Sequence, residues 1–455
     1  MKLGRVNLVE GVIWRSLVLY ALPLLLSNFL QQLYNTADLL IVGRYAGSHA
    51  MGSVGAIGSV TAMLVGLAVG LATGCTVVVS QYYGAEDYDG LFKTVHTAMA
   101  IAVGGGIILT AAGILLAPFL LNLMNTPPEI FDGAVLYMRI YFGGIIPTLI
   151  YNMGAGILNA VGDSKRPFSF LLVSAVTNVL FDIVLVAWFS LGVAGAAIAT
   201  VIAQVVAALL VLISLTRTHS PYRVFIKDIR FHKEVLKKVS RIGLPAGTQS
   251  VLISISNTFI QAKVNSFGAM AVAGVAVANR VDGFIFVVMN AISLATMTFT
   301  GQNVGAAKPD RVRRGLYTSA VMVVAVSLSL AWTVLSFAPT IASWFNDDPG
   351  VTFYTVRMMS FILPFYFIFG LNDVISGFLR GRGKSMVPML TSLIFMTGAR
   401  LLWIWLVTPS WPSIDVVFMA YPVTWLLTFI VLFIYLLKTY GFRSDRHEEK
   451  ELERL

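Results

Sequence analysis

The chain has 455 residues, of which 57% are hydrophobic and only 12% are charged, and its mean hydropathy is +0.81. This composition excludes an ordinary soluble domain and is typical of a polytopic membrane protein. The net charge of +10 does not indicate nucleic-acid binding, because most of the 32 Lys and Arg residues lie in short segments between apolar runs, as in cytoplasmic loops. Cys75 is the single cysteine, so neither an internal disulfide nor a thiolate metal site is available.

Twelve apolar runs are each long enough, at about 20 residues, to cross a bilayer as a helix. They cover residues 17–42, 51–80, 94–121, 135–158, 168–190, 193–215, 243–267, 272–300, 315–338, 354–379, 386–407 and 415–437. We therefore predict an all-α polytopic membrane protein with twelve transmembrane helices and a retained first helix. Placing both termini in the cytoplasm puts most Lys and Arg residues inside, as the positive-inside rule requires.

The first span carries a polar stripe that ends in an acid. Asn28, Gln31, Asn35 and Asp38 are spaced three, four and three residues apart, so they share one helix face. Such a stripe does not face lipid, and an intramembrane carboxylate indicates a site for an ion, a proton or a substrate. The alternative is that Asp38 lies at the headgroup boundary, but the continuation of the stripe to Asn28 favours a site.

The second span contains the repeated small-residue pattern Gly66, Gly70 and Gly74, which predicts a close helix-packing face. The longest connection, residues 216–241, carries eight Lys or Arg and two His. We expect it to be a solvated segment beside anionic lipid with no further role. The predicted divisions are an N-terminal lobe over 1–215, a basic cytoplasmic linker over 216–241, a C-terminal lobe over 242–440 and a charged cytoplasmic tail over 441–455.

The two halves of the chain resemble each other at a nearly constant offset. Pro23 and Asn35 match Pro245 and Asn257, and further matches continue along both halves. Because each half has an even number of spans, the repeats are parallel and related by an axis along the membrane normal, with a cavity expected between the lobes. Pro23 is predicted to bend the first helix and to free a backbone carbonyl.

The repeat fails at three polar residues, which points to function rather than scaffold. Asp38 falls opposite Ile260, Asp182 opposite Trp403, and Asn178 opposite Ala399. Asn178 and Asp182 are four residues apart and share a helix face, and Thr200 on the next span is a further oxygen donor. These groups either hold Na+ or keep one carboxylate protonated, because two desolvated carboxylates do not both ionise cheaply. Ordinary interhelical hydrogen bonding is the alternative for Asn178 and Thr200.

The C-terminal lobe has two intramembrane acids. Asp282 is expected to pair with a basic residue on a neighbouring helix, whereas Asp373 has no sequence-adjacent partner and is a candidate cation contact. The predicted substrate cavity is lined by Gln31, Asn35, Asn152, Asn257, Gln261 and Asp373. Five basic residues within or at the ends of spans need partners or a route to the interface: Arg139, Lys263, Arg280, Arg357 and Arg400.

The sequence favours an ion gradient over ATP as the energy source. Residues 383–385 look like the end of a phosphate loop, but the glycine required five positions earlier is Phe378. No segment outside the spans is large enough for a nucleotide-binding domain. We expect no catalytic residues and no cofactor, and no metal beyond a possible bound Na+.

These residues together resemble the multidrug and toxic compound extrusion (MATE) family. The resemblance rests on the stretch from Gln31 through Asp38 to Arg44, the Gln-x-x-Gly-Ala loop after the second span, the run GVAGAAIAT over 192–200, and Asp373 leading to 379–381. It implies two six-helix lobes around a V-shaped cavity, with antiport of cationic or amphiphilic drugs against Na+ or H+.

The resemblance also implies site residues. Asp38, Asn178, Asp182 and Thr200 match the N-lobe cation site of DinF-type members, in which the first helix bends at the proline matched by Pro23. Asp373 matches the C-lobe aspartate of NorM-type members, but the seventh span here has no glutamate to pair with it. Coupling is therefore placed in the N-lobe.

Two alternatives differ in what the cavity must bind. A flippase for lipid-linked saccharide precursors needs several basic residues for pyrophosphate, whereas this chain places acids there. A channel or a purely structural membrane protein has no need of a titrating ion site. We predict a monomeric transporter, not an enzyme, in the cell membrane, whose partners are small-molecule drugs and the lipid bilayer and not nucleic acid.

Overall fold

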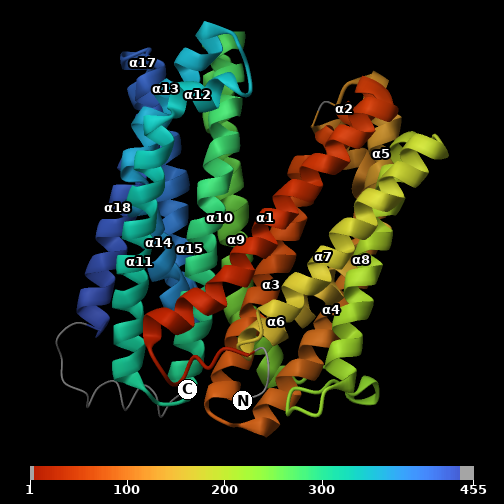
Figure 1. The fold of residues 1–455 in the computed structure, drawn as a ribbon, viewed down its shortest axis with the longest axis vertical. Coiled ribbons are helices and arrows are strands. Elements are labelled where there is room, and N and C mark those ends of the chain that lie inside the picture. The colour runs from red at the N-terminus through yellow and green to blue at the C-terminus, as the bar shows by residue number, and fades with distance from the viewer. Residues whose placement is uncertain (1–4, 125, 441–455) are drawn as a thin grey trace. The chain divides into compact units, whose positions relative to one another are not determined.

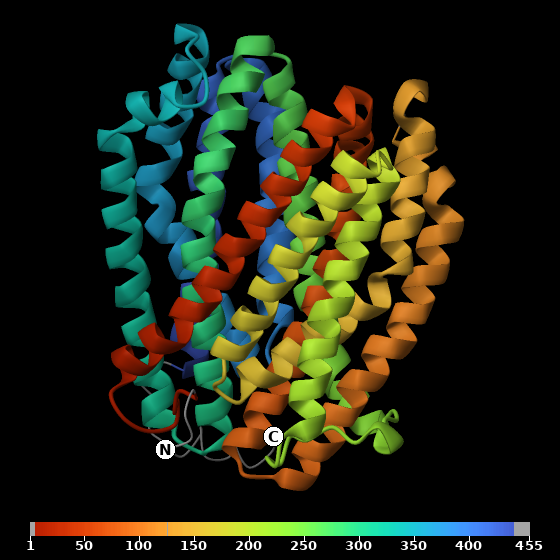
Figure 2. The ribbon, with the colours of Figure 1, turned by 45° about the vertical axis from the view of Figure 1, so that its right-hand side comes forward.

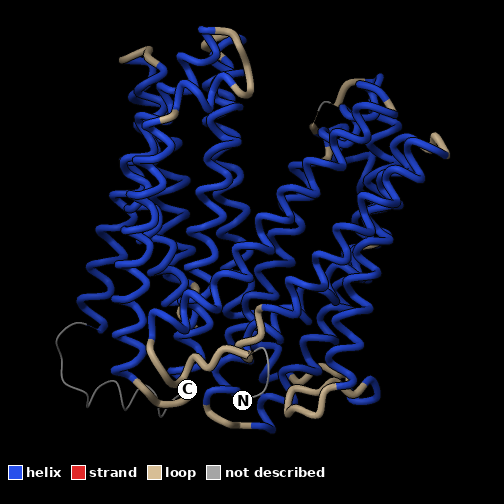
Figure 3. The backbone as a smooth tube through the Cα atoms, viewed as in Figure 1, coloured by secondary structure: helices blue, strands red, loops and turns tan. Residues whose placement is uncertain are grey.

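The computed structural model describes residues 5–124 and 126–440, and all regular secondary structure in these ranges is helical (Figure 3). Ten of the described helices are long and apolar enough to cross a membrane, and a bent pair, α5 (Pro128–Gly143) and α6 (Ile145–Ala160), supplies an eleventh span. The prediction of an all-α polytopic membrane protein is confirmed. The predicted tail, 441–455, lies outside the described residues.

The chain forms two compact units. Unit 1 contains residues up to Val6 and Leu22–Gly243, and unit 2 contains Asn7–Ala21 and the residues from Leu244 onward. Two of the three internal boundaries, those before Leu22 and Leu244, fall just before a proline, Pro23 or Pro245. The first helix of each repeat therefore starts in one unit and continues in the other.

Unit 1 consists of antiparallel helices joined by short loops (Figures 1 and 2). After α1 (Ile13–Tyr45) come α2 (Gly47–Ala56), α3 (Gly58–Gly84), α4 (Tyr88–Leu123), α5, α6, α7 (Lys165–Asp182) with the π-helix η1 (Ile183–Trp188), α8 (Gly192–Arg217) and the short 3-10 turn η2 (Ile226–Asp228). Helices α5 and α6 meet at an angle of 48° around Gly144, so the predicted span 135–158 is a broken helix. One apolar core includes Val42, Ile57 and Phe142.

Close packing joins α3 to the beginning of α9 (Lys233–Asn265) within unit 1. A Cβ atom on Gly74 would lie 2.4 Å from the Val239 carbonyl oxygen, and one on Gly243 would lie 2.9 Å from the Gly70 carbonyl oxygen. Only glycine allows the two backbones to approach this closely. The predicted packing face is confirmed for Gly70 and Gly74.

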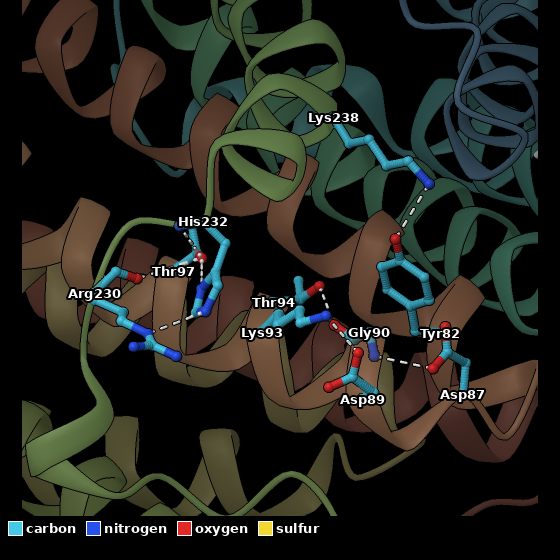
Figure 4. A network of polar contacts seen from close by, with 10 residues as sticks. All are labelled: Tyr82, Asp87, Asp89, Gly90, Lys93, Thr94, Thr97, Arg230, His232 and Lys238. Atoms are coloured by element: carbon cyan, nitrogen blue, oxygen red, sulfur yellow. Dashed lines mark hydrogen bonds and ion pairs between the residues drawn. The ribbon is translucent and has the colours of Figure 1, made fainter.

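The basic segment 216–241 packs against the ends of α3 and α4, so the expectation of a solvated segment is wrong for part of it. Tyr222 and Val224 are fully or almost fully buried. Figure 4 shows the second half of the segment: the Thr97 hydroxyl accepts a bond from the His232 backbone N–H (3.2 Å), and the Lys238 ammonium donates to the Tyr82 hydroxyl (3.1 Å).

Unit 2 repeats the helical plan of unit 1 with more breaks. Its helices are the rest of α9, then α10 (Ala269–Gly305), α11 (Pro309–Ser336), α12 (Ala338–Ser343), α13 (Pro349–Ile362), η3 (Leu363–Phe365), α14 (Tyr366–Gly381), α15 (Met386–Thr391), η4 (Ser392–Ala399), α16 (Arg400–Leu402), η5 (Trp403–Val407), α17 (Thr408–Ser410) and α18 (Ile414–Tyr440). Helix α9 begins at Lys233 within the basic segment, almost three turns ahead of its predicted span, and its polar residues keep it outside the apolar set. The core of unit 2 includes Ile260, Met289 and Phe418.

Candidate functional site

The polar stripe of α1 runs from the surface into the interior of unit 1. Gln31 and Asn35 are exposed, whereas the side chain of Asp38, one turn further, is only 9% exposed. Amide side chains are costly in lipid, so the exposed part of the stripe suits a water-filled cavity. Helix α1 continues through Pro23, whose carbonyl accepts a bond from the Ser27 hydroxyl (2.8 Å).

Asp38 meets Asp182, at the last turn of α7, inside unit 1. Asp182 is fully buried, and the two carboxyl groups lie close enough to interact. They are nevertheless not joined by an ordinary hydrogen bond, because both Asp182 oxygens and Oδ1 of Asp38 have no such partner among the described residues. Two neighbouring buried carboxyl groups require a bound cation or a shared proton.

Asn178 completes this cluster from one turn earlier on α7. It is 1% exposed, and neither its Oδ1 nor its Nδ2 makes a hydrogen bond within the described part of the chain. The three side chains thus present four buried oxygen acceptors and one amide donor without partners. Each such group costs about 1–3 kcal/mol when it is left unsatisfied. Hard oxygen ligands of this kind fit Na+ or a proton.

Thr200 and Tyr137 border the cluster. The Thr200 hydroxyl donates to the Ala196 carbonyl (3.1 Å) and lies beside the Tyr137 hydroxyl. Tyr137, on α5, is buried and interacts with the charges of both Asp38 and Asp182. Sequence reasoning missed Tyr137, since nothing in the spacing along α5 indicates which neighbouring helix it faces.

Asp373 in unit 2 has no sequence-adjacent partner, as predicted, but a basic residue further along its own helix lies near it. Arg380, two turns later on α14, interacts with its charge. The Arg380 guanidinium also donates to Oε1 of Gln249 (2.5 Å), and the Asp373 backbone carbonyl accepts from the Ser293 hydroxyl (2.7 Å). Oδ2 of Asp373 is buried without a hydrogen bond in the described chain. One acceptor on this acid is therefore still available.

Asp282 does not pair with a basic residue in the described ranges, contrary to expectation. Its charge interacts with Tyr421 on α18. Arg357 forms a two-point ion pair with Asp415 at 2.8 and 2.5 Å. Among the other basic residues of the spans, Arg139 and Arg280 are exposed, Lys263 is half-buried, and Arg400 is buried.

The remaining predicted cavity residues make local bonds within their own units. In unit 1 the Asn152 amide donates to the Thr148 carbonyl (2.8 Å). In unit 2 the exposed Asn257 accepts from Nη1 of Arg400 (3.2 Å), and Gln261 donates to Asn265 (3.0 Å). Asn257 is thus the predicted cavity residue that meets a buried charge directly.

The MatE family model matches residues 23–184 and again 245–406, which together exceed half of the chain. The chain belongs to the MatE family. The two matched segments are equal in length and start at the prolines that mark the repeat, so the internal repeat is confirmed. Membership of this family, with relatives named as multidrug resistance proteins, points to a transport function.

Curated relatives and solved structures match most or nearly all of the chain. The chain is 26% identical over 453 residues to "Probable multidrug resistance protein YoeA" of Bacillus subtilis (strain 168), covering 97% of this chain and 96% of the relative. It is 25% identical over 357 residues to "FAD transporter" of Shewanella oneidensis (strain ATCC 700550 / JCM 31522 / CIP 106686 / LMG 19005 / NCIMB 14063 / MR-1), covering 76% of this chain and 77% of that one. The structure titled "Crystal structure of MATE in the bent conformation" has a TM-score of 0.89 at 21% identity, covering 99% and 98% of the two chains. The likeness in fold confirms the two-lobe, twelve-helix architecture.

Proposed function

We propose that this MatE protein is a secondary active antiporter that exports cationic or amphiphilic compounds in exchange for Na+ or H+. The observation that carries the proposal is the buried cluster of unit 1. Asp38, Asn178 and Asp182 together leave five polar atoms without hydrogen-bond partners in the described chain. A group of this kind is destabilising unless it binds something, and a monovalent cation or a proton satisfies its charge.

The coupling ion acts through α1. Asp38 lies on the same helix as the exposed Gln31 and Asn35, which we assign to the substrate cavity with Asn152, Asn257, Gln261 and Asp373. Release of the ion leaves the two carboxyl groups repelling each other, which favours a different conformation of α1 near Pro23. Substrate and ion then exclude each other because each binds a different state of one helix.

The energy available from the ion is adequate for this exchange. A charge that crosses the membrane potential gains about 2.3 kcal/mol per 100 mV, before any concentration gradient is added. With both termini in the cytoplasm, an inward ion gradient drives export. The protein works as a monomer in the cell membrane, and its N-lobe site is of the DinF type.

Drugs are the proposed substrates because the relative matched over nearly the whole chain is named a multidrug resistance protein. Another relative is named a FAD transporter, so the family transports more than one chemical class. A lipid-linked saccharide flippase is not favoured, since the buried cluster is acidic and not basic.

The proposal is tested by drug-triggered ion flux in proteoliposomes, with Na+ and H+ gradients imposed separately. Wild-type protein is expected to release the coupling ion when a cationic dye such as ethidium is added, whereas a folded Asp38→Asn variant releases none. Dye movement that is independent of both gradients in the wild type would contradict antiport.

A further inference from the structure

Unit 2 contains a buried positive charge that no carboxylate of the described residues contacts. Arg400 is 3% exposed and belongs to the short helix α16, between the π-helices η4 and η5. A guanidinium inside a membrane span normally pairs with an acid. Here the hydrogen-bond partners of Arg400 among the described residues are all neutral, and the centroid of the Tyr421 ring lies 4.6 Å from the guanidinium carbon.

Three long hydrogen bonds hold this guanidinium. Nη1 donates to Oγ of Ser256 and Oδ1 of Asn257, and Nη2 donates to Oγ1 of Thr424, each at 3.2 Å. The Ser256 hydroxyl donates its own proton to the Met396 carbonyl (2.8 Å), and the Thr424 hydroxyl donates to the Ala420 carbonyl (2.7 Å). They therefore accept from Arg400 but do not neutralise it.

The guanidinium keeps unused donors. An arginine has five N–H groups. Nε of Arg400 is buried with no hydrogen-bond partner among the described residues, and the three bonds above use only the two Nη atoms. Its planar geometry is suited to a carboxylate, which forms charge-assisted bonds that are about twice as strong as the neutral bonds present.

Asn257 gives this site a connection to the surface. Its side chain is exposed, whereas the neighbouring Ser256 is fully buried. A ligand oxygen in the place of Oδ1 of Asn257 would accept a hydrogen bond from Nη1 of Arg400. Arg400 also follows Ala399, the repeat counterpart of the neutral Asn178.

We propose that Arg400 is a subsite for a carboxylate group of the substrate, so that unit 2 selects zwitterionic amphiphiles. This inference rests on the proposed function, whose cation site lies in unit 1. The alternative is that Arg400 serves only to join α9, α16 and α18.

The test uses two dyes that differ by one carboxylate, tetramethylrhodamine and its methyl ester. Their binding to purified protein in detergent is measured by fluorescence polarisation. Arg400→Gln is expected to weaken binding of the free acid about tenfold relative to the ester, the scale of losing a charge-assisted hydrogen bond. Arg357→Gln, which removes an arginine already paired with Asp415, should leave the ratio of the two affinities unchanged.

A second variant keeps the proposal testable if Arg400→Gln does not fold. Asn257→Asp places a carboxylate beside Nη1, which preserves any joining role of Arg400 but occupies the subsite. The protein should fold, and the ratio of acid to ester binding should fall as it does in Arg400→Gln. An unchanged ratio in folded Asn257→Asp, or an equal loss for both dyes in Arg400→Gln, would overturn the subsite.

Two further measurements distinguish a substrate carboxylate from chloride at Arg400, and this subsite from the antiport proposal. If wild-type protein binds the acid less tightly in sodium chloride than in sodium methanesulfonate, whose anion carries no carboxylate, and Arg400→Gln removes that difference, the anionic site is confirmed with chloride as a competing occupant. No chloride effect, with the variant ratios as above, assigns the site to the substrate carboxylate alone. Ethidium-triggered ion flux that persists in Arg400→Gln keeps the antiport proposal separate from this one.

Discussion

Asp38 and Ile260 occupy equivalent positions of the two repeats, but their surroundings differ completely. Asp38 lies beside Asp182 and leaves its Oδ1 without a hydrogen bond in the described chain. Ile260 is 2% exposed in the apolar core of unit 2. Trp403, the counterpart of Asp182, packs against that core and donates its indole N–H to the Val416 carbonyl (2.8 Å).

The fold does not require acids at the positions of Asp38 and Asp182, which unit 1 carries in addition. Unit 2 shows that an apolar residue and a satisfied indole can fill these positions in the same helical plan. Unit 1 instead carries unsatisfied polar atoms at a cost of about 1–3 kcal/mol each. Stability therefore does not explain Asp38 and Asp182, which supports our proposal that they bind an ion or a proton.

The largest expected effect follows from removing either acid. Asp38→Asn should abolish uphill efflux in proteoliposomes while the protein stays folded, because the amide cannot carry the ion or the proton. Asp182→Asn should be similarly severe, since the two carboxyl groups act as a pair. Thermal unfolding in detergent serves as the folding control. Uphill transport by folded Asp38→Asn with the wild-type ion dependence would place coupling elsewhere, first at Asp373.

Asp373→Asn should have a smaller and more selective effect. Removal of this acid takes away a contact for a cationic substrate, so the apparent KM should rise for cationic dyes and change less for neutral ones. It also leaves Arg380 without its acidic neighbour, which should lower the unfolding temperature. The double variant Asp373→Asn with Arg380→Gln should restore stability but not KM. An equal loss of transport for both dye classes would mark Asp373 as structural or coupling.

The sequence was sufficient for the helical spans, the repeat and the grouping of Asp38 with Asp182, because periodicity and repeat symmetry encode them locally. Neighbours across helices were not predictable in the same way. Tyr137 joins the cluster through packing of α5, which spacing does not specify. Arg380 was predictable in principle, since a separation of seven residues places it on the same helix face as Asp373.

The burial of the basic segment is hard to predict for a different reason. Its composition resembles a solvated linker, and charge content dominates such a prediction. The apolar residues between the charges, Tyr222 and Val224, are nevertheless buried in unit 1. Sequence composition averages over these few residues, whereas packing depends on them individually.

Ile260→Val tests the unit 2 side of the comparison and should be nearly silent. Loss of one buried methylene costs about 1 kcal/mol of unfolding free energy. Transport and its ion dependence should match the wild type, because Ile260 contacts an apolar core and no ion. Chemical denaturation and proteoliposome efflux measure the two quantities. A loss of coupling in this variant would mean that the two repeats share the ion-binding role.

The smallest expected effect concerns pH and the attachment of the basic segment to unit 1. Burial, with help from the charge of Arg230, lowers the pKa of His232 below its usual 6.5. The ring is held neutral, since Nε2 accepts from the Arg230 guanidinium (3.3 Å) and Nδ1 then donates to the Thr97 hydroxyl (3.1 Å). The stabilisation from this packing is present above pH 6.5 and is lost as the pH falls through the lowered pKa. Hydrogen exchange of residues 230–238 should therefore increase on acidification, and His232→Gln should remove most of that pH dependence. The same increase in the variant would assign the effect to another titrating group.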